Sequence, residues 1–410
     1  MKITPVKGCA DYLPREALIR DYLQSTIVET YRSCGFERIY TPIIEDIENL
    51  DKSDGGENLN LIFKIMKRGE KLEEALKSGI PAELSDMGLR YDLTLPLTRY
   101  YSNNRAKLPS TFKVIQTDRV YRAERPQKGR MREFVQCDID IIGSDSWTAE
   151  VELISTTAKA LNNIGFKNFN IRINDRRLLK AIIMSAGFAK EDCDSVCISL
   201  DKLDKIDFNG VKSELIDKGF DAAKVEELIS KISVKPFTLD NAEEICGELD
   251  CIKNLRLIMD AANSLADGYS VEYDMTLVRG QGYYTGTVFE ISSPEFRGAI
   301  GGGGRYDNLI GKFLGESIPA VGFSIGFERI AAILLSSDYE IPAMKKRIAI
   351  IYNEDNFTSA MRRADEMRKE YDIAMYEEVK KFGKLLAKLE EVGFAGCYIE
   401  SKNEMKFFGE

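Results

Sequence analysis

Apolar and polar residues alternate along the first third of the chain with two different periods. Apolar positions recur every three or four residues over 15–33, which predicts an amphipathic helix. Alternation over 36–46 predicts a strand, and Pro42 favours a place at a sheet edge or an interface. Two longer alternating runs, 111–124 and 132–143, predict a strand pair whose connection reads RPQKGRM. We therefore expect a helix followed by strands, two of which form a hairpin.

The middle of the chain breaks this strand pattern. A helix near 147–163 and a strand FKNFNIRIN precede segment 175–265, which is rich in Lys, Asp, Glu and Leu and shows no strand alternation. Strand patterns resume at SVEYDMTLVRG and continue through YYTGTVFEISS, AIGGGGRYDNLI and VGFSIGFERIAAIL, whose second half predicts a helix. Segment 175–265 is therefore expected to be a helical insertion in a mainly antiparallel sheet domain formed by 1–174 and 266–340.

A domain boundary is expected near Pro342 and the basic KKR that follows it. Beyond it, strand and helix patterns alternate through RIAIIYN, TSAMRRADEMRKEY, IAMYEE, GKLLAKLEEVG and AGCYIE. This order is typical of a small α/β module of parallel character, here 345–410. The predicted fold class is α+β: an antiparallel sheet domain, a helical insertion and a C-terminal α/β domain.

Composition places the chain among ordinary globular proteins. Its 410 residues suffice for two or three domains, and 44% are hydrophobic while 30% are charged. No run approaches the roughly 18 uncharged apolar residues of a membrane helix, and the N-terminus has no secretion-signal pattern. We therefore expect a cytoplasmic protein with no membrane association.

The eight cysteines are scattered, which favours reduced thiols. Cys193, Cys197, Cys246 and Cys251 raise a zinc interpretation, but the spacings miss the usual C-x2-C and no histidine is present to complete a site. Buried thiols that act as small hydrophobic side chains are favoured instead.

Charge and the absence of histidine narrow the possible chemistry. A net charge of -9 argues against nonspecific nucleic-acid binding, including DNA, but is compatible with a polyanion bound by a local arginine cluster. With no histidine, Ser-His and Cys-His nucleophile systems and histidine-ligated metals are excluded. Any catalysis must use carboxylates, arginines, tyrosines and a loosely held hard metal.

The hairpin connection is a candidate anion site. Its charged residues fall within eleven positions and are Arg122, Glu124, Arg125, Lys128, Arg130 and Arg132. Arginine forks match the paired oxygens of a phosphate, and a cluster this dense repels itself without an anion. A solvated turn with ion pairs to Glu124 and Glu133 is the alternative.

A second group of polar residues lies on strand-like segments. Gln136, Asp138 and Asp140 share one face by the strand period, and RYDLTLPLTRY adds Asp92 and Thr94. Burying such a face is costly unless it meets cationic or polar partners. An amine-bearing ligand would satisfy it, and so would a structural network with nearby arginines.

Two further segments are weaker candidates. The glycines of AIGGGGRYD permit close approach of a ligand, although a bulged or tightly packed strand explains them equally well. Arg329, at a predicted strand-to-helix junction in GFSIGFERI, faces an anion or stacks on an aromatic base, or else forms an ion pair on the helix surface.

The order of these segments resembles the three signature motifs of class II aminoacyl-tRNA synthetases. LVRGQGYYTGTVFE and GGGGRYD are similar to the two histidine-specific motifs of histidyl-tRNA synthetases, YRAERPQKGRMREFVQ to their motif 2, and PAVGFSIGFERI to their motif 3. The resemblance runs from Gly8 to about Arg347 and continues weakly into the C-terminal module.

The resemblance implies a fold, an activity and partners. The fold would be the class II antiparallel catalytic domain, followed by a shortened domain like the anticodon-binding domain of the class. The activity would be that of a histidine–tRNA ligase, which uses ATP and Mg²⁺ to convert histidine to histidyl-adenylate and transfers it to tRNA(His). Motif 1, around 33–46, implies a homodimer.

The resemblance also implies roles for individual residues. Histidine would be bound by Asp92, Thr94, Arg122, Gln136, Asp140, Arg279, Tyr283 and Tyr284. ATP would be bound by Glu124, Arg130, Arg132, Phe134 and Arg329, with Phe134 and Arg329 on either side of the adenine. Arg122 and Arg279 would be catalytic, because both would stabilise charge at the α-phosphate.

One segment departs from the family pattern. Where the family usually reads RGLDYY, this chain has Gln281 and Gly282 before the tyrosines. The main competing interpretation is a histidine-sensing regulatory subunit of ATP phosphoribosyltransferase, which does not charge tRNA. Such paralogues usually lose the motif arginines and the C-terminal domain, and this chain has both. A noncatalytic RNA-binding protein with the same fold is the third interpretation.

Overall fold

The computed structural model describes residues 3–50, 58–125, 131–203, 206–278, 283–337 and 339–409. The chain divides into two compact units, Met1–Asp338 and Tyr339–Glu410. Among the described helices, none combines the length and apolar character needed to cross a bilayer.

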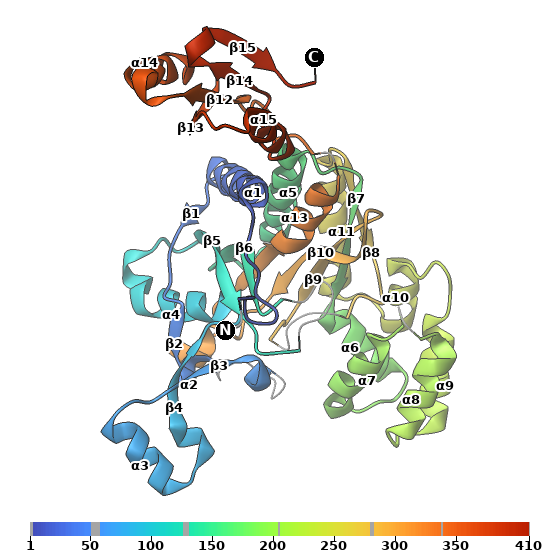
Figure 1. The fold of residues 1–410 in the computed structure, drawn as a ribbon. Coiled ribbons are helices and arrows are strands. Elements are labelled where there is room, and N and C mark those ends of the chain that lie inside the picture. Colours follow the sequence, from blue (N-terminus) through green and yellow to red (C-terminus); the bar gives the residue numbers. More distant parts are fainter. Residues whose placement is uncertain are drawn as a thin grey trace. The chain divides into compact units, whose positions relative to one another are not determined.

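The larger unit is built on an eight-stranded sheet (Figure 1). In spatial order its strands are β1 (Glu37–Arg38), β5 (Phe112–Tyr121), β6 (Glu133–Ile142), β11 (Ala320–Ile325), β10 (Phe296–Arg305), β9 (Thr287–Ser293), β7 (Phe169–Asp175) and β8 (Tyr269–Tyr273). The outermost pairs β1–β5 and β7–β8 are parallel, and the pairs between them are antiparallel. The prediction of a mainly antiparallel sheet is confirmed.

Helices cover one face of this sheet. They are α1 (Pro14–Ser33), α5 (Thr148–Ile164) and α13 (Phe327–Ser336), which pack on one another and on β6, β10 and β11. Strand alternation explains the sidedness, since Cys137, Ile139 and Ile141 of β6 are buried while the intervening polar residues face the other way. The opposite face of the sheet is therefore left for polar chemistry.

A second, three-stranded sheet follows α1 in sequence. Its strands, in spatial order, are β2 (Ile44–Asp46), β4 (Ser85–Leu89) and β3 (Phe63–Met66). Three helices accompany it: α2 (Ile47–Leu50), α3 (Glu70–Ser78) and α4 (Thr94–Asn104). The strand predicted over 36–46 is thus wrong as a single element, because residues on either side of Pro42 join different sheets.

Helices fill the segment between β7 and β8. They are α6 (Arg176–Ser185), α7 (Cys193–Leu200), α8 (Phe208–Asp217), α9 (Ala222–Ile232), α10 (Leu239–Cys246) and α11 (Asp250–Ser264). Side chains cap several of their first turns, as when Asp175 accepts a hydrogen bond from Arg177 N and Asp221 from Ala223 N. The helix pattern of the sequence is confirmed here, since strands β7 and β8 pair directly and these helices branch off from their ends.

The smaller unit is a four-stranded sheet with two helices. Its strands, in spatial order, are β13 (Asp372–Glu377), β12 (Arg347–Tyr352), β14 (Gly396–Ile399) and β15 (Glu404–Phe407), and its helices are α14 (Phe357–Met367) and α15 (Phe382–Glu391). The first three strands are parallel, as predicted, and β15 adds an antiparallel edge that the sequence pattern did not indicate.

A short helix α12 (Gly311–Leu314) completes the larger unit. The 3-10 turns are η1 (Asn58–Leu61), η2 (Pro81–Leu84), η3 (Arg105–Lys107), η4 (Lys190–Asp192), η5 (Glu354–Asn356) and η6 (Glu400–Lys402).

Candidate active site

Two adjoining cavities lie on the face of the large sheet that the helices leave open. The larger has a volume of about 510 Å³ and the smaller about 150 Å³. The residues that line both are Arg122, Gln136, Tyr284, Gly302, Gly303 and Ser324. At about 30 Å³ per water, the smaller cavity has room for about five waters, or for one small amino acid.

Three buried carboxylates line the smaller cavity. Asp92, Asp138 and Asp140 are 2%, 5% and 4% exposed. Asp92 Oδ1 accepts a hydrogen bond from Leu95 N in the first turn of α4, and its Oδ2 accepts none from the described residues. Tyr306 Oη donates to Asp140 Oδ1 at 2.6 Å. The cavity is therefore acidic, and a cationic group would compensate it.

Burial raises the pKa values of all three carboxyl groups. Desolvation is the largest cause in each, and it raises the pKa of Asp92 from 3.8 to about 6 and that of Asp138 from 3.8 to about 7. The pKa of Asp140 is raised well above its ordinary value by burial and by the charge of Asp138. A cation that enters this cavity would stabilise the ionised forms and lower these pKa values.

Aromatic side chains form another wall of the smaller cavity. The rings of Tyr283 and Tyr284 meet edge to face at 5.0 Å, and Tyr283 packs edge to face on Tyr306 at 6.0 Å. Tyr283 Oη donates to Thr94 Oγ1 at 3.4 Å. Burial raises the pKa of Tyr283 well above its ordinary value, so its hydroxyl stays protonated. The predicted histidine-binding residues that the structure describes therefore all line one cavity.

Arg122 stands at the junction of the two cavities. It follows β5, and its Nε donates to Tyr91 O at 3.1 Å, while its guanidinium lies 4.8 Å above the ring of Phe134. A single planar cation thus contacts the acidic pocket on one side and the larger cavity on the other. This placement suits a group shared by two substrates.

The larger cavity brings together three of the predicted ATP-binding residues, Glu124, Phe134 and Arg329. Arg329 lies near the start of α13, donates to Ala299 O and is 5.6 Å from the ring of Phe296. Whether Phe134 and Arg329 enclose an adenine stays a prediction. Arg132 lines neither cavity, because its Nε donates to Glu124 O at 3.1 Å and holds the two arms of the hairpin together.

Several predicted residues lie outside the described part of the chain. These are Arg130 and Lys128 of the hairpin connection, and Arg279, Gln281 and Gly282.

Close packing accounts for the glycine run of β10. A Cβ on Gly303 would lie 2.0 Å from Gly322 O, and one on Gly304 would lie 2.7 Å from Thr287 O. The register of β10 with β9 also shifts between Phe296 and Gly301. The tightly packed strand is therefore the better of the two interpretations, although Gly302 and Gly303 also line both cavities.

Comparison with known proteins decides the family. The sequence model of the histidyl-tRNA synthetase family matches residues 8–330. A histidine–tRNA ligase of Leifsonia xyli subsp. xyli is 42% identical over 346 residues, which cover 81% of this chain and 80% of the relative. The chain belongs to the histidyl-tRNA synthetase family. The resemblance inferred from the motifs is confirmed.

Solved structures agree on the fold. A histidyl-tRNA synthetase from Nostoc sp. PCC 7120 superposes with a TM-score of 0.80 at 24% identity, over 99% of this chain and 96% of that one. An ATP phosphoribosyltransferase regulatory subunit/histidyl-tRNA synthetase from Bacillus halodurans C gives 0.78 at 19% identity, over 95% of this chain and 97% of that one. The predicted α+β class II fold is confirmed. The fold does not separate a synthetase from a regulatory subunit, because the description of the Bacillus halodurans C protein names both.

Sequence reasoning missed two residues of this site. Tyr306 lies within GGGGRYD, and the sequence predicts no role for it, yet it donates a hydrogen bond to Asp140. Gly322 lies within the segment similar to motif 3, and a Cβ there would lie 1.9 Å from Asp140 Oδ1. The only signal for either residue is its place inside a segment that resembles a family motif. Their partners are set by strand pairing, which the sequence pattern did not specify.

A row of polar residues crosses the sheet beneath the cavities. In the observed register the row runs from β5 to β8 as Gln116, Asp138, Ser324, Gly302, Glu290, Arg172 and Glu272. Arg172 pairs with Glu290 and also with Asp274 at 2.8 Å. Directly opposed residues share a face of the sheet, so Asp138 and Glu290 both face the cavity side.

The acidic residues of the larger cavity limit where a divalent cation could bind. Glu328 accepts from Arg20 and from Val135 N, so it ties α13 to α1 and β6. Glu290 is buried, lines the cavity and pairs with Arg172. The described residues contain no group of three or more metal-binding side chains. Mg²⁺ commonly takes one or two carboxylates together with substrate phosphates, and Glu290 fits that arrangement.

The eight cysteines are free, and five of them are buried: Cys137, Cys193, Cys197, Cys251 and Cys397. Burial agrees with the role predicted for Cys193, Cys197 and Cys251, whereas Cys246 is only partly buried. Burial raises their pKa values, so these thiols stay protonated and unreactive.

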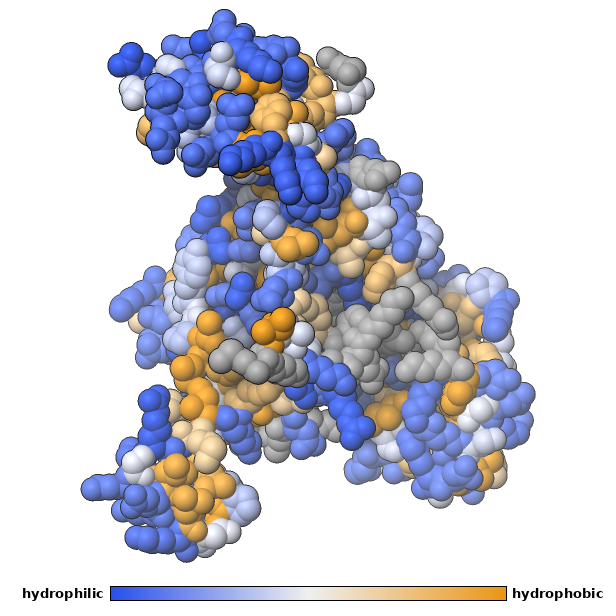
Figure 2. Space-filling view, viewed as in Figure 1, coloured by the Kyte–Doolittle hydropathy of each residue, from blue (hydrophilic) through white to orange (hydrophobic). Residues whose placement is uncertain are grey.

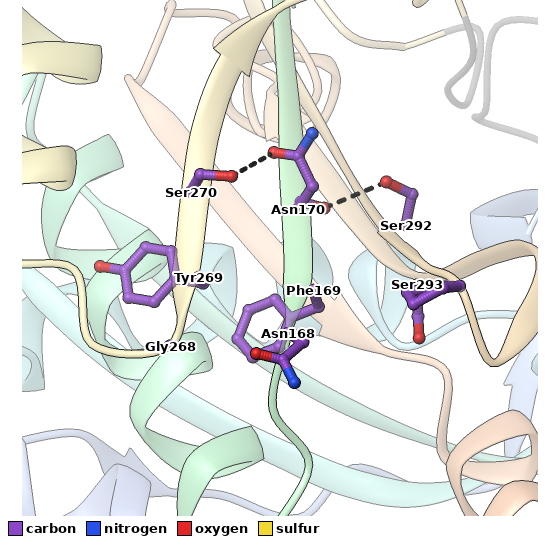
Figure 3. Close-up of a pocket in the computed structure, with 9 residues that line it drawn as sticks. Asn168, Phe169, Asn170, Gly268, Tyr269, Ser270, Ser292 and Ser293 are labelled. Carbon is purple, nitrogen blue, oxygen red and sulfur yellow. Dashed lines mark hydrogen bonds between the residues drawn. The ribbon is translucent and has the colours of Figure 1, made fainter.

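A third depression does not form part of this site. It measures about 650 Å³ and lies where β7, β8 and β9 adjoin, with asparagine, serine, glycine, proline and aromatic side chains but no charged one (Figure 3). Ser270 Oγ donates to Asn170 Oδ1 at 3.2 Å, and Ser292 Oγ donates to Asn170 O at 3.3 Å (Figure 3). These polar groups satisfy one another and offer no acid, base or cation for chemistry.

Proposed function

We infer that this chain is a histidine–tRNA ligase, an aminoacyl-tRNA ligase that activates histidine with ATP and transfers it to tRNA. The observation that carries this function is the pair of adjoining cavities that share Arg122, one acidic and the size of an amino acid, the other larger and lined by Phe134 and Arg329. Family membership supplies the reaction, and the cavities supply a place for each substrate.

In this proposal the smaller cavity binds histidine. Asp92 receives the α-ammonium group, because its Oδ2 is buried and has no partner in the described structure. Asp140, held by Tyr306, faces the imidazole, and Tyr283 and Tyr284 close that end of the cavity. A cationic ammonium offsets the desolvation cost that raises the pKa values of these carboxyl groups. Thr94 and Gln136 complete the contacts.

The larger cavity binds ATP. Phe134 and Arg329 hold the adenine, and Glu124, Arg130 and Arg132 are assigned to ATP by their motif positions. Glu290 would hold Mg²⁺ together with substrate phosphates, and the ion would supply positive charge beside the pyrophosphate. Arg130 and Arg132 are supported only by motif position, since Arg130 lies outside the described residues and the Arg132 side chain contacts backbone oxygens of Glu124 and Lys7.

Adenylation requires positioning and charge stabilisation rather than a histidine base. A carboxylate oxygen of the substrate attacks the α-phosphorus, an O–P bond forms, and the bond to pyrophosphate breaks. Arg122 lies at the junction where these atoms would meet and balances the developing negative charge. Arg279 takes the same role by its motif position. The absence of histidine in the chain is therefore no obstacle to the reaction.

A cytoplasmic homodimer that binds tRNA(His), in part through residues 345–410, completes the proposal. The face of the three-stranded sheet supports a dimer: strand pairing places Ile44, Met87 and Leu89 on one side together with Phe63 and Ile65, and Asp46, opposite Met87, is the one charged residue among these paired positions. Ile44 is 50% exposed and Met87 40%. Figure 2 shows hydrophobic side chains at its lower left, where Figure 1 places α3 and β4. A second copy would cover this apolar face.

Histidine-dependent exchange of pyrophosphate into ATP, followed by charging of tRNA(His), tests the function. The ligase exchanges only when histidine is present and then charges the tRNA. No exchange, together with co-purification of an ATP phosphoribosyltransferase, would favour the regulatory subunit instead. Arg279→Ala should abolish exchange and leave histidine binding largely intact, and preserved exchange would refute its role.

Sedimentation velocity tests the dimer separately. Met87→Lys should shift the chain toward monomer, because a charge on the apolar face would be buried at the interface. Met184→Lys, on α6 and 42% exposed, is the matched control and should sediment like the unmodified chain.

A further inference from the structure

Asp138 lies in the histidine cavity but has no role in the proposed set of contacts. It is on β6 between Gln136 and Asp140, and it shares their face of the sheet. At about 3.3 Å per residue, Gln136 and Asp140 are about 13 Å apart along the strand, and Asp138 is midway. Asp140 would face the imidazole end of the substrate, so Gln136, beside Arg122 at the junction, faces the end that carries the α-carbon.

The contacts of Asp138 fix the orientation of a neighbouring carboxamide. Gln136 Nε2 donates to Asp138 Oδ2 at 3.1 Å and to Oδ1 at 3.4 Å. A cationic ligand in the cavity favours the ionised form of Asp138, and an ionised carboxylate only accepts hydrogen bonds, so it selects the NH₂ end of the glutamine. Gln136 Oε1 must then point away from Asp138. It is buried and accepts no hydrogen bond from the described part of the chain.

A buried acceptor without a donor is costly, and the cost disappears when a ligand supplies an N–H group. The α-ammonium group of histidine is such a donor. Three donors on that group allow Gln136 Oε1 and Asp92 Oδ2, both buried and without a partner in the described structure, to bind it together.

We propose that Asp138 is a positioning residue for histidine recognition: it holds the Gln136 carboxamide so that Oε1 accepts a hydrogen bond from the substrate α-ammonium group. This inference rests on the proposed ligase function and deepens it. The position of Asp138 is itself fixed by strand pairing to Gln116 and Ser324, so the orientation is built into the sheet. Ser324 also hydrogen-bonds the Asp138 carboxylate.

A double-mutant cycle in histidine-dependent pyrophosphate exchange tests the proposal on the full chain. Asp138→Ala should raise the KM for histidine about tenfold and leave the KM for ATP within about twofold, because Asp138 lines the smaller cavity and not the larger. Gln136→Ala should raise the histidine KM at least as much. In the Gln136→Ala background, Asp138→Ala should add less than about twofold. If each substitution instead raises the histidine KM by its own factor and the two factors multiply in the double variant, the proposal is wrong.

Substrate analogues with and without the amine distinguish loss of the ammonium contact from a general structural defect. Histidinol keeps the amine, whereas imidazolepropionate lacks it. As competitive inhibitors, histidinol should bind about tenfold more weakly to Asp138→Ala and imidazolepropionate should bind unchanged. Equal weakening of both would overturn the proposal. Asp138→Asn, whose Oδ1 can accept from Gln136 Nε2, should recover part of the histidinol affinity, and no recovery would count against it.

The ligase function and the positioning role of Asp138 can be refuted separately. If the unmodified chain shows no histidine-dependent exchange, the ligase function fails. If it exchanges and the two substitutions act independently, only the role of Asp138 fails. Thermal unfolding of each variant checks folding, and the analogue comparison within one variant keeps the test valid if Asp138→Ala is less stable.

Discussion

Tyr306 Oη donates a 2.6 Å hydrogen bond to Asp140 Oδ1, and this bond joins the residue that follows β10 to the C-terminal part of β6. Tyr306→Phe keeps the ring and removes only the donor. A hydrogen bond to a charged group contributes about 1.5–3 kcal/mol, so the KM for histidine should rise about tenfold or more. Steady-state exchange assays at fixed ATP measure it. Tyr352→Phe, in the smaller unit, is the control, and a histidine KM equal to that of the unmodified chain would contradict the role of Tyr306.

Gly322 controls the same carboxylate by leaving space for it. A Cβ at Gly322 would lie 1.9 Å from Asp140 Oδ1, so Gly322→Ala must displace the carboxylate from Tyr306. We expect the rate of histidine-dependent exchange at low histidine to fall at least tenfold. Gly383→Ala is the control, because a Cβ there meets no atom within 4 Å. If calorimetry finds equal histidine affinity for the two variants, the steric argument is wrong.

The raised pKa of Asp92 predicts a pH-dependent effect on stability. Burial raises this pKa from 3.8 to about 6, so the group stabilises the fold most below pH 3.8, and this contribution is lost as pH rises to about 6. Asp92→Asn removes the ionisation. The free energy of unfolding of the variant should equal that of the unmodified chain near pH 4. Above pH 6 it should be larger by up to about 3 kcal/mol, since one pKa unit corresponds to about 1.36 kcal/mol.

Urea unfolding at several pH values, without histidine, measures this difference. Asp11→Asn, at an exposed position, is the control and should show no such pH dependence. Stability that stays equal across the whole range would contradict the effect of burial. The same Asp92→Asn variant should lose histidine binding, since it lacks the charge that faces the ammonium group.

Arg90 is a structural clamp and should dominate local stability. It is 0% exposed, donates to Thr41 O at 2.8 Å and to Arg119 O at 2.9 Å, and pairs with Asp118 at 2.8 Å. Breaking a buried charged network costs about 3–5 kcal/mol, so Arg90→Ala should lower the free energy of unfolding by that amount. Arg119→Ala removes a largely exposed pair with Glu133 and should cost about 1 kcal/mol or less. Similar losses in the two variants would contradict this view.

The adenine prediction concerns Phe134 and Arg329. If both contact the base, Phe134→Ala should raise the KM for ATP about tenfold, because stacking on an aromatic ring contributes about 1–3 kcal/mol per base. The histidine KM should change much less, since Phe134 does not line the smaller cavity. Phe313→Ala, on α12, is the control. An unchanged ATP KM for Phe134→Ala would place the adenine elsewhere.

The sequence predicted the elements that have a strong period. The helix at 15–33 and the hairpin strands around Asp118 and Asp138 were confirmed because each buries one side against the other elements. The strand at 36–46 was wrong because a continuous alternation does not reveal a change of sheet. The three-stranded sheet was missed, since its strands are short and Gly88 interrupts the pattern of β4.

The candidate site could be predicted only where a single segment carried the signal. Gln136 and Asp140 are four residues apart on one strand. Because side chains of a strand alternate with a period of two, their common face follows from the sequence. Gly322 and Tyr306 reach Asp140 from other strands, and nothing in their own segments specifies that meeting. The roles of Arg279 and Gln281 stay predictions, because both lie outside the described residues.

The glycines of β10 have a consequence for how this gene can vary. Backbone oxygens or ring atoms from neighbouring strands occupy the positions where a Cβ of Gly303 or Gly304 would lie. Every nucleotide change at the first or second base of those codons adds a side chain or stops translation, whereas any third-base change still encodes glycine. In a saturation library selected for growth, these codons should therefore keep synonymous diversity and lose all other diversity, including alanine.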